Sequence, residues 1–144
     1  MTRITDLATL EAVYAGPLSA ATTAKDSPII TPTYRTLIEA SPCLALATVG
    51  PEGADCSPRG DRGPVVRVLD ERTLALPDRR GNNRIESLRN IVRDPRVGLL
   101  FLIPGSGTTV RVNGRASISI DPEFLDAFAV EGAIPRSVIL ISVD

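Results

Sequence analysis

The sequence predicts a mainly β fold, an antiparallel barrel with flanking helices, and two observations carry this prediction. From Cys43 onward, short apolar segments rich in branched residues alternate with turn signals, which is typical of antiparallel strands. Few helices separate these segments, and this favours a barrel over a parallel α/β sheet. The 144 residues suit one domain, with residues 1–42 as a helical N-terminal cover and residues 43–144 as the barrel.

Two helices are expected in the N-terminal cover. Thr5 is placed to cap a first helix that runs through Tyr14, and the spacing of Leu7, Leu10 and Tyr14 predicts one buried stripe. A second short helix is expected over residues 31–41, because it opens on Thr-Pro and proline is favoured in the first helical turn.

Four strands are expected before a central helix. Pro51-Glu52-Gly53 predicts a tight turn between the first two, because proline presets one turn angle and glycine accepts positive φ. Asp70-Glu71-Arg72 is expected to turn the chain between the next two. These strands are expected at residues 43–49, 53–57, 64–70 and 73–77.

The central helix is expected over residues 84–93, where Ile85, Leu88 and Val92 form one apolar stripe. Asp94-Pro95 should end it, since proline cannot continue a helix.

Two longer strands, a short helix and a last strand are expected after the central helix. Asn113-Gly114, within the second long strand, suggests a bulge or a bend. The expected ranges are 96–103 and 108–120 for the two long strands, 122–130 for the helix and 137–143 for the last strand.

Composition excludes several classes of function. The chain has no histidine, which removes Ser-His-Asp catalysis, a His-Cys pair, histidine-ligated haem and most zinc sites. Its 16 basic residues are outnumbered by 17 acidic ones, so no broad basic surface for nucleic acid is expected. Cys43 and Cys56 match no metal or disulfide pattern and are expected to pack as reduced thiols.

The location of the protein follows from its hydrophobic segments. The N-terminus lacks the basic start and continuous apolar stretch of a secretory signal. The longest apolar run, Val97–Ile103, is far shorter than the roughly 20 residues that a membrane-spanning helix needs. We therefore expect a soluble, cytoplasmic protein without a membrane partner.

The junction Asp78–Ser87, which reads DRRGNNRIES, combines several features that can bind an anion. Asn83 suits the N-cap of the central helix, with Glu86 three residues on as in a capping box. Free backbone N–H groups and the helix dipole attract phosphate at such a position, and nearby arginines supply charged donors. Taken alone, arginines on a loop and a short helix are more often simply solvated, so the pattern by itself indicates only an anion site.

Two further clusters are candidates for ligand contacts. The segment SPRGDRG follows an expected strand, and Ser57 or Arg59 could contact polar edges of a ligand; read alone, it is a turn with solvated charges. Arg111 lies in the strand segment TTVRVNGRA on the face opposite Val110 and Val112, which suits either a ligand groove or ordinary solvent exposure.

Four ordered segments together resemble a known family. They are LALATVGPEG, SPRGD, LPDRRGNNRIESLRNIVRDPRVGLLF and TTVRVNGRA. From about Ala40 to Ala116 the chain resembles the pyridoxamine 5′-phosphate oxidase-like FMN-binding flavoproteins, and in particular a bacterial subgroup with the SPRGD and DRRGNNR motifs. The resemblance implies an FMN-binding split β-barrel and a homodimer with FMN at the subunit interface. It also implies a further C-terminal segment beyond Asp144.

The resemblance implies a set of cofactor-binding residues. Those that correspond to phosphate ligands are Arg79, Asn83 and Arg84, with Arg80 and Ser87 as additional candidates. Pro77 and Asp78 correspond to positions along the ribityl chain or the ring. Those that correspond to flavin contacts are Ser57, Arg59 and Asp61, and Arg111 is expected to approach from the neighbouring strand.

The same comparison separates cofactor binding from the activity in the family's name. Pyridoxamine phosphate oxidases proper have an Arg-Lys pair in the phosphate segment and a histidine in the substrate site. This chain has Asn82-Asn83-Arg84 instead of the pair, and no histidine. Vitamin B6 oxidation is therefore not expected.

Three functions are compatible with this cofactor. The first is an FMN-dependent oxidoreductase in which the flavin exchanges hydride with a small-molecule substrate. The second is a flavin-binding sensor or carrier without efficient turnover. The third is a reductase that holds the deazaflavin F420 on the same fold, although the polyglutamyl tail of F420 would favour a more basic surface than this near-neutral chain offers.

Overall fold

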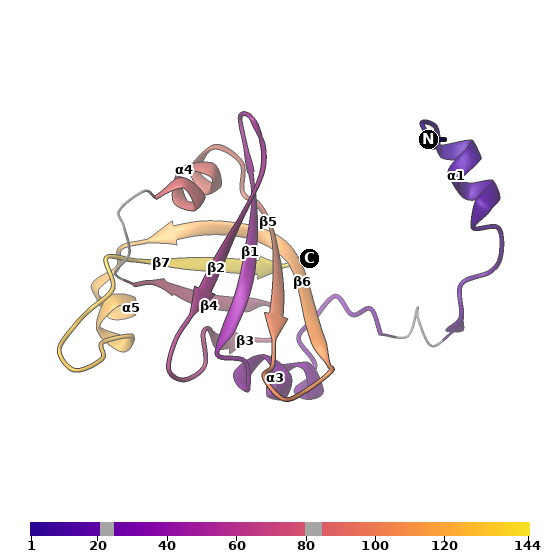
Figure 1. The fold of residues 1–144 in the computed structure, drawn as a ribbon. Helices are drawn as coiled ribbons and strands as arrows, with labels where there is room; N and C mark the ends of the chain where they lie inside the picture. The colour runs from indigo at the N-terminus through magenta and orange to yellow at the C-terminus, as the bar shows by residue number, and fades with distance from the viewer. Residues whose placement is uncertain (21–24, 80–84) are drawn as a thin grey trace.

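The fold is a curled antiparallel sheet with short helices around it (Figure 1). The computed structural model describes residues 1–20, 25–79 and 85–144. The seven strands are hydrogen-bonded in the order β2-β1-β5-β6-β7-β4-β3, and every neighbouring pair is antiparallel. The strands are β1 (Cys43–Gly50), β2 (Gly53–Gly60), β3 (Arg67–Asp70), β4 (Thr73–Asp78), β5 (Arg96–Leu102), β6 (Thr109–Ser119) and β7 (Ser137–Val143).

The strand order leaves an opening in the barrel. β2 and β3 lie at the two ends of the sheet, and no pairing among the described residues joins them. The sheet therefore curls into a split β-barrel, and the predicted fold class is confirmed. The turns at Pro51-Glu52 and Glu71-Arg72 are also confirmed, with Gly53 at a φ of 127°.

Two of the predicted strands differ by three residues from their predicted ranges. β2 continues three residues beyond the predicted end, because its pairing with β1 runs through Gly60. β3 begins only at Arg67, since residues 61–66 follow an irregular path in which the Asp61 and Val65 N–H groups bond to the carbonyls of Pro42 and Ser41.

Apolar residues that alternate along the strands fill the barrel. Leu44 and Leu46 of β1 face inward and lie opposite Phe101 and Leu99 of β5, as the pleat of a half-buried strand requires. Phe101 is the largest fully buried side chain. The same inward face continues through β6, β7 and β4 in a single cluster.

β6 passes through Asn113-Gly114 without a bulge. Its pairing with β5 is continuous there, so the predicted bulge is wrong, and Figure 1 shows β6 as a curved strand. A Cβ atom at Gly114 would lie 2.2 Å from the Ser142 carbonyl oxygen. Glycine is therefore required here by the close approach of the β7 backbone.

α3 (Pro32–Glu39) and α5 (Pro122–Ala127) pack on the barrel as short helices. Thr31 caps α3, its hydroxyl accepting the Tyr34 N–H at 3.2 Å, so the predicted Thr-Pro start is confirmed. α5 is three residues shorter than predicted, and the Phe128 side chain that follows it packs over Ala75 and Val138 on the outer face of the sheet.

α4 (Glu86–Arg93) differs from the predicted central helix in its start and in its buried face. Ile85 occupies the N-cap position with a φ of 48° and no side-chain cap, so the capping box at Asn83 is wrong; Asn83 itself lies outside the described residues. Ser87, Asn90 and Ile91 are buried. Of the predicted apolar stripe, Leu88 packs against the core, whereas Ile85 is 44% and Val92 is 78% exposed, so the stripe is right at Leu88 alone. Asn90 can be buried because its amide donates to the Thr48 hydroxyl at 3.0 Å.

α1 (Leu7–Val13) lies apart from the barrel at the end of an extended arm (Figure 1). Asp6, not Thr5, caps it, by accepting the Thr9 N–H at 2.8 Å. None of its residues is buried, so the prediction of a buried stripe through Leu7, Leu10 and Tyr14 is wrong for this chain on its own.

Candidate functional site

Two ion pairs connect β2 to β4 across the opening of the barrel. Arg59 and Asp78 are 2.8 Å apart, and Arg79 and Asp61 are 2.7 Å apart. All four side chains are largely buried, with 19–31% of their surface exposed. The SPRGD segment and the start of DRRGNNRIES, about 20 residues apart in sequence, therefore meet at one place.

Strand register explains why Arg59 and Asp78 face each other. Arg59 lies opposite the buried Leu44, and Ser57 lies opposite Leu46, so both point to the inner side of the sheet. Asp78 lies opposite the buried Ser137 and points to the inner side from β4. The Arg59 Nε also donates to the Ser57 hydroxyl at 3.2 Å, which fixes the direction of the guanidinium.

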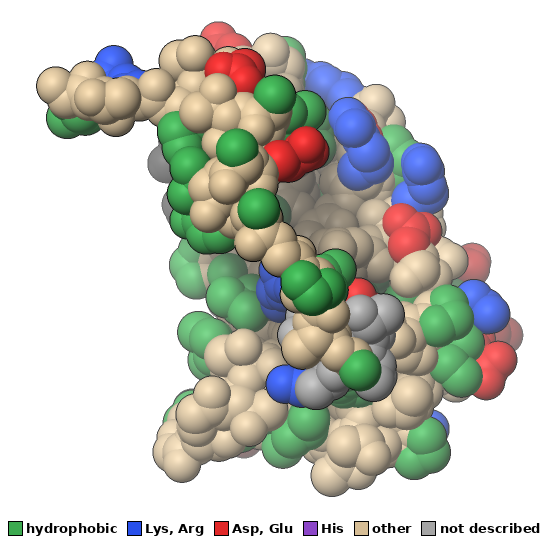
Figure 2. Space-filling model, turned by 90° about the vertical axis from the view of Figure 1, so that its right-hand side faces the viewer, with side chains coloured by type: hydrophobic (Ala, Val, Ile, Leu, Met, Phe, Trp, Pro, Cys, Tyr) green, Lys and Arg blue, Asp and Glu red, His purple; other side chains and the backbone are tan. Residues whose placement is uncertain are grey.

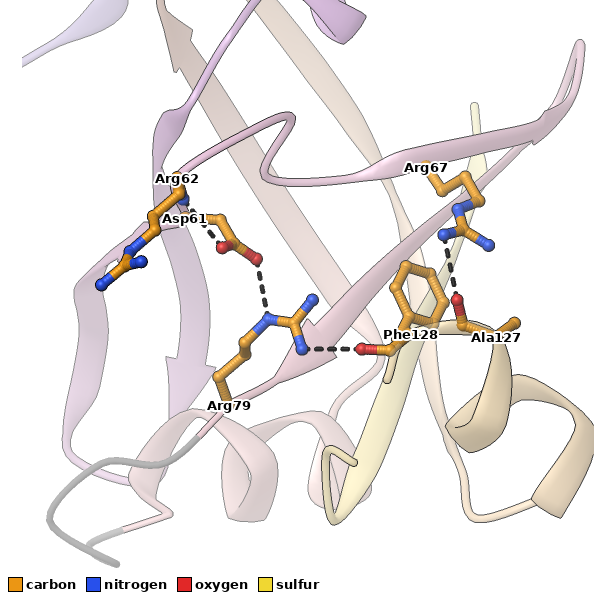
Figure 3. A network of polar contacts seen from close by, with 6 residues as sticks. All are labelled: Asp61, Arg62, Arg67, Arg79, Ala127 and Phe128. Atoms are coloured by element: carbon orange, nitrogen blue, oxygen red, sulfur yellow. Dashed lines mark hydrogen bonds and ion pairs between the residues drawn. The ribbon is translucent and has the colours of Figure 1, made fainter. Parts of the chain in front are cut away.

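Arg79 is held by two partners from different elements (Figure 3). Its Nε donates to Asp61 at 2.7 Å, and its Nη1 donates to the Phe128 carbonyl at 2.8 Å. Asp61 in turn accepts the backbone N–H of Arg62 at 2.8 Å. A planar guanidinium with several fixed donors suits recognition of a phosphate or carboxylate, and here its orientation is set before a ligand arrives.

A pocket of about 250 Å³ lies beside this network. Arg67 forms one wall: its guanidinium stacks over the Phe128 ring at 4.5 Å, and its Nη2 donates to the Ala127 carbonyl at 3.0 Å (Figure 3). Arg67 forms no ion pair with any carboxylate in the described part of the chain, so its charge is available to an anion. The lining residues are Glu39, Pro64, Val66, Arg67, Pro77, Arg79 and Phe128.

Sequence reasoning missed Arg67 and Phe128. An arginine between Val66 and Val68 on an expected strand was a usable signal for Arg67, because that alternation places it on the opposite face from the core. Phe128 gave no signal, since its place depends on how α5 packs on the outer face of β4 and β7.

The structure brings together six of the predicted site residues, which are Ser57, Arg59, Asp61, Pro77, Asp78 and Arg79. Ser87 is buried in the first turn of α4. Arg111 is exposed on the outer face of β6, opposite Leu100, and is not brought together with Ser57 and Arg59 on the inner face. The remaining predicted residues, Arg80, Asn83 and Arg84, lie outside the described residues.

A comparison with protein-family models identifies the chain. The model described as pyridoxamine 5′-phosphate oxidase matches residues 30–144, which includes the whole barrel. The chain belongs to the pyridoxamine 5′-phosphate oxidase family. No match is found among curated protein sequences.

Solved structures with the same fold come from several bacteria. A pyridoxamine 5′-phosphate oxidase candidate from Lactobacillus delbrueckii is 23% identical, with 83% of this chain and 94% of that chain covered and a TM-score of 0.65. HupZ from Group A Streptococcus is 20% identical over 80% and 90%, with a TM-score of 0.63. An FMN-binding protein from Syntrophomonas wolfei is 14% identical over 76% and 79%, with a TM-score of 0.54. These similarities support the split-barrel fold of the family.

The described residues show two further features of this chain. None of their helices is long and apolar enough to cross a membrane. Across residues 1–20, 25–79 and 85–144, no three His, Cys, Asp or Glu side chains are grouped as a metal site would require. The side-chain donors at the site are the guanidinium groups of Arg59, Arg67 and Arg79 and the hydroxyl of Ser57, and such donors suit an anionic ligand.

Proposed function

We propose that this protein binds FMN and acts as an FMN-dependent oxidoreductase on a small molecule. The proposal is carried by two ion pairs, Arg59–Asp78 and Asp61–Arg79, which join the SPRGD segment to Asp78 and Arg79. Arg79 also lines the pocket. Membership of the family and the fold shared with a bacterial FMN-binding protein support the choice of cofactor.

The residues present fit the chemistry of FMN, which carries a phosphate and a polar ring edge. We assign the phosphate to Arg79 with Asn83 and Arg84, and to Arg80 and Ser87 beside them. We assign the ribityl chain and ring to Ser57, Arg59, Asp61, Pro77 and Asp78. Arg111 is left out of this set because it lies on the outer face of β6.

Bound FMN would exchange hydride with the substrate, and the protein's residues would bind and orient the FMN and the substrate. Arg59 and Arg79 hold positive charge in fixed positions, and Ser57 supplies a hydroxyl beside Arg59. The chain has no histidine, the side chain that most often exchanges protons near neutral pH. We therefore propose substrates that react with the flavin directly.

We propose that the protein acts as a homodimer. The pocket of about 250 Å³ is smaller than the roughly 300–1,000 Å³ usual for small-molecule sites, so one chain encloses only part of a flavin. A second copy placed against the opening would complete the site, as the resemblance to dimeric flavoproteins implies.

The visible absorption spectrum of protein purified without added cofactor tests the cofactor. We expect a flavin spectrum and, after denaturation, release of a ligand with the mass of FMN. Release of F420 would identify the deazaflavin, and not FMN, as the cofactor. Colourless protein that also fails to take up added FMN would reject the proposal.

Stopped-flow oxidation of the photoreduced protein tests turnover. An oxidoreductase should be reoxidised faster as the concentration of its acceptor rises, across a panel of quinones, nitroaromatics and oxygen. A rate that is independent of every acceptor would indicate a flavin sensor or carrier instead. Pyridoxamine 5′-phosphate belongs in the panel as a substrate for the oxidised enzyme, and we expect no turnover of it.

A further inference from the structure

α1 exposes an apolar face to solvent, although a helix as short as α1 is not stable on its own. Its large apolar side chains are 40–77% exposed. Leu7, Leu10 and Tyr14 fall on one side of the helix, with spacings of three and four residues. A helix of seven residues is far below the roughly 12–15 residues at which isolated helices become even marginally stable. α1 therefore needs a surface to pack on.

The barrel exposes an apolar surface of its own. The face of β1 and β5 that points away from the core also carries Cys43 and Gly98, and Arg96 at one end. Its apolar part, here called the outer sheet face, is formed by Ala45, Ala47, Val49, Leu100 and Leu102. Leu100 is 36% exposed and Leu102 is 43% exposed. In antiparallel sheets the face that meets water is usually polar, so this face is typical of a surface that another element covers.

The charges beside these two surfaces are complementary. Glu11 lies on the same side of α1 as Leu7, Leu10 and Tyr14. Arg111 lies directly opposite Leu100 at the border of the outer sheet face, and it forms no hydrogen bond or ion pair with any described residue. One acidic group thus lies beside the helix stripe, and one unpaired basic group lies beside the sheet face.

The side of the arm that carries this stripe borders an open hollow. The hollow has a volume of about 540 Å³ and is lined by Leu10, Glu11, Tyr14, Ala15 and Gly16. Figure 2 shows this side of the molecule, with hydrophobic side chains exposed along the N-terminal arm and a hollowed surface beside it. In one chain, therefore, no described barrel residue lines the hollow beside the stripe of α1.

We propose that α1 of one chain packs on the outer sheet face of a second copy, and that the second copy's α1 does the same in return. A twofold axis makes the two contacts equivalent, so each copy gives one helix and receives one. Glu11 then lies near Arg111 of the partner subunit. The inference rests on the homodimer proposed above and is independent of the identity of the cofactor.

A matched pair of substitutions tests the helix side of this contact in the full chain. Leu10→Asp introduces a charge into the apolar stripe, whereas Ala12→Asp introduces the same charge on the opposite side of the same helix. We expect analytical ultracentrifugation to show a dimer for the wild type and for Ala12→Asp. Leu10→Asp should raise the dimer dissociation constant by at least about tenfold, as burial of an unpaired charge at an interface requires.

A mixing experiment distinguishes exchange between copies from docking of α1 on its own barrel. Leu100→Asp damages the receiving face and leaves α1 intact, while Leu10→Asp does the opposite. A homodimer of either variant lacks both contacts. A mixed dimer retains one contact, in which the intact α1 of the Leu100→Asp chain packs on the intact outer sheet face of the Leu10→Asp chain. We expect a tagged Leu10→Asp chain to associate with Leu100→Asp more tightly than either variant associates with itself.

Three outcomes would overturn the proposal. They are a monomeric wild type, an unchanged dissociation constant for Leu10→Asp, and a mixture no tighter than the separate variants. The last outcome, together with a lowered unfolding midpoint for Leu10→Asp, would place α1 on its own barrel. FMN absorbance is recorded in every sample, so a failure of cofactor binding appears separately from a failure of association.

Discussion

Arg59 and Asp78 form an ion pair, 2.8 Å from Nη1 to Oδ1, that links the edge strand β2 to β4 across the opening of the barrel. These two strands are not neighbours in the sheet, because four other strands separate them in the order of pairing. Arg79 and Asp61 form a second link beside the first. Side chains, not a backbone ladder, therefore hold the two motifs of the candidate site at a fixed separation.

Loss of one partner from the Arg59–Asp78 pair should destabilise the protein. Asp78→Ala leaves a guanidinium that is 19% exposed without its carboxylate, and we expect a loss of about 1–3 kcal/mol in the free energy of unfolding. Urea denaturation of the cofactor-free protein measures it. Glu39→Ala is the control, since the Arg35–Glu39 pair is 53% and 43% exposed and should contribute only about 0.3–0.5 kcal/mol. Equal losses for the two variants would contradict this role.

Alanine should be tolerated at Gly98 but not at Gly114. A Cβ at Gly114 meets the Ser142 carbonyl at 2.2 Å, and relief of that clash would have to move the β7 backbone. At Gly98, on the neighbouring strand, the nearest atom is 3.6 Å away. We expect Gly114→Ala to cost about 1–3 kcal/mol or more and Gly98→Ala less than about 1 kcal/mol, as measured by thermal unfolding. A Gly114→Ala protein as stable as the wild type would mean that β7 can shift freely.

The Asn90–Thr48 hydrogen bond should anchor α4 to β1. Thr48→Val removes the acceptor and keeps the shape, so the buried Asn90 amide loses its partner, at a cost of about 1–3 kcal/mol. Thr48→Ser keeps the hydroxyl and should cost less. Hydrogen exchange of the α4 amides measures whether the helix loosens. Equal effects for valine and serine would contradict an anchoring role of the hydrogen bond, because only valine removes the acceptor.

The interaction of Asp94 with Arg96 should stabilise the folded protein, and this contribution should be lost only in strong acid. Hydrogen bonds from the Arg96 side chain and backbone lower the pKa of the Asp94 carboxyl from 3.8 to about 2. Because the folded-state pKa is depressed, this stability is present above pH ~4 and is lost as the pH falls toward 2. An NMR titration of the carboxyl should show the low midpoint. In Arg96→Gln the pKa should rise only part of the way to 3.8, since the backbone N–H of residue 96 still donates.

Local patterns in the sequence predicted the barrel strands well. β7 has the predicted ends, and β1, β4, β5 and β6 differ from prediction by one residue at one or both ends. These strands alternate between apolar and polar residues, or pair through short turns such as Pro51-Glu52, so neighbours in sequence determine them. The extent of β3 was missed because residues 61–66 bond to Pro42 and Ser41, which are distant in sequence.

The helices show the limit of the same reasoning. The apolar spacing in α4 predicted a stripe through Val92, but the helix buries Ser87 and Asn90, because a hydrogen bond to Thr48 of β1 satisfies Asn90. In the candidate site, the motifs predicted that Arg59 and Arg79 bind one ligand. The structure brings the two residues together, and their role toward a ligand stays a prediction. Their pairing with Asp78 and Asp61 depends on how the barrel closes, which no local pattern encodes.

Arg79 should contribute more to FMN binding than other arginines of its basic segment. Its guanidinium is fixed by Asp61 and by the Phe128 carbonyl, so its remaining donors are held in place before a ligand binds. Arg79→Ala should raise the FMN dissociation constant about 10- to 100-fold, the usual effect of losing a charge-assisted hydrogen bond. Quenching of flavin fluorescence on titration of cofactor-free protein measures it.

Arg93→Ala is the matched control for that change, because Arg93 is an exposed base at the end of α4 and carries the same charge. If FMN were attracted only by the general excess of arginine between residues 78 and 96, both variants would weaken binding equally, and more so at low salt. Arg79→Lys separates charge from geometry, since lysine keeps the charge but cannot bond to both Asp61 and Phe128 in the same planar arrangement. Affinity close to that of Arg79→Ala would show that the fixed guanidinium, not its charge, binds the phosphate.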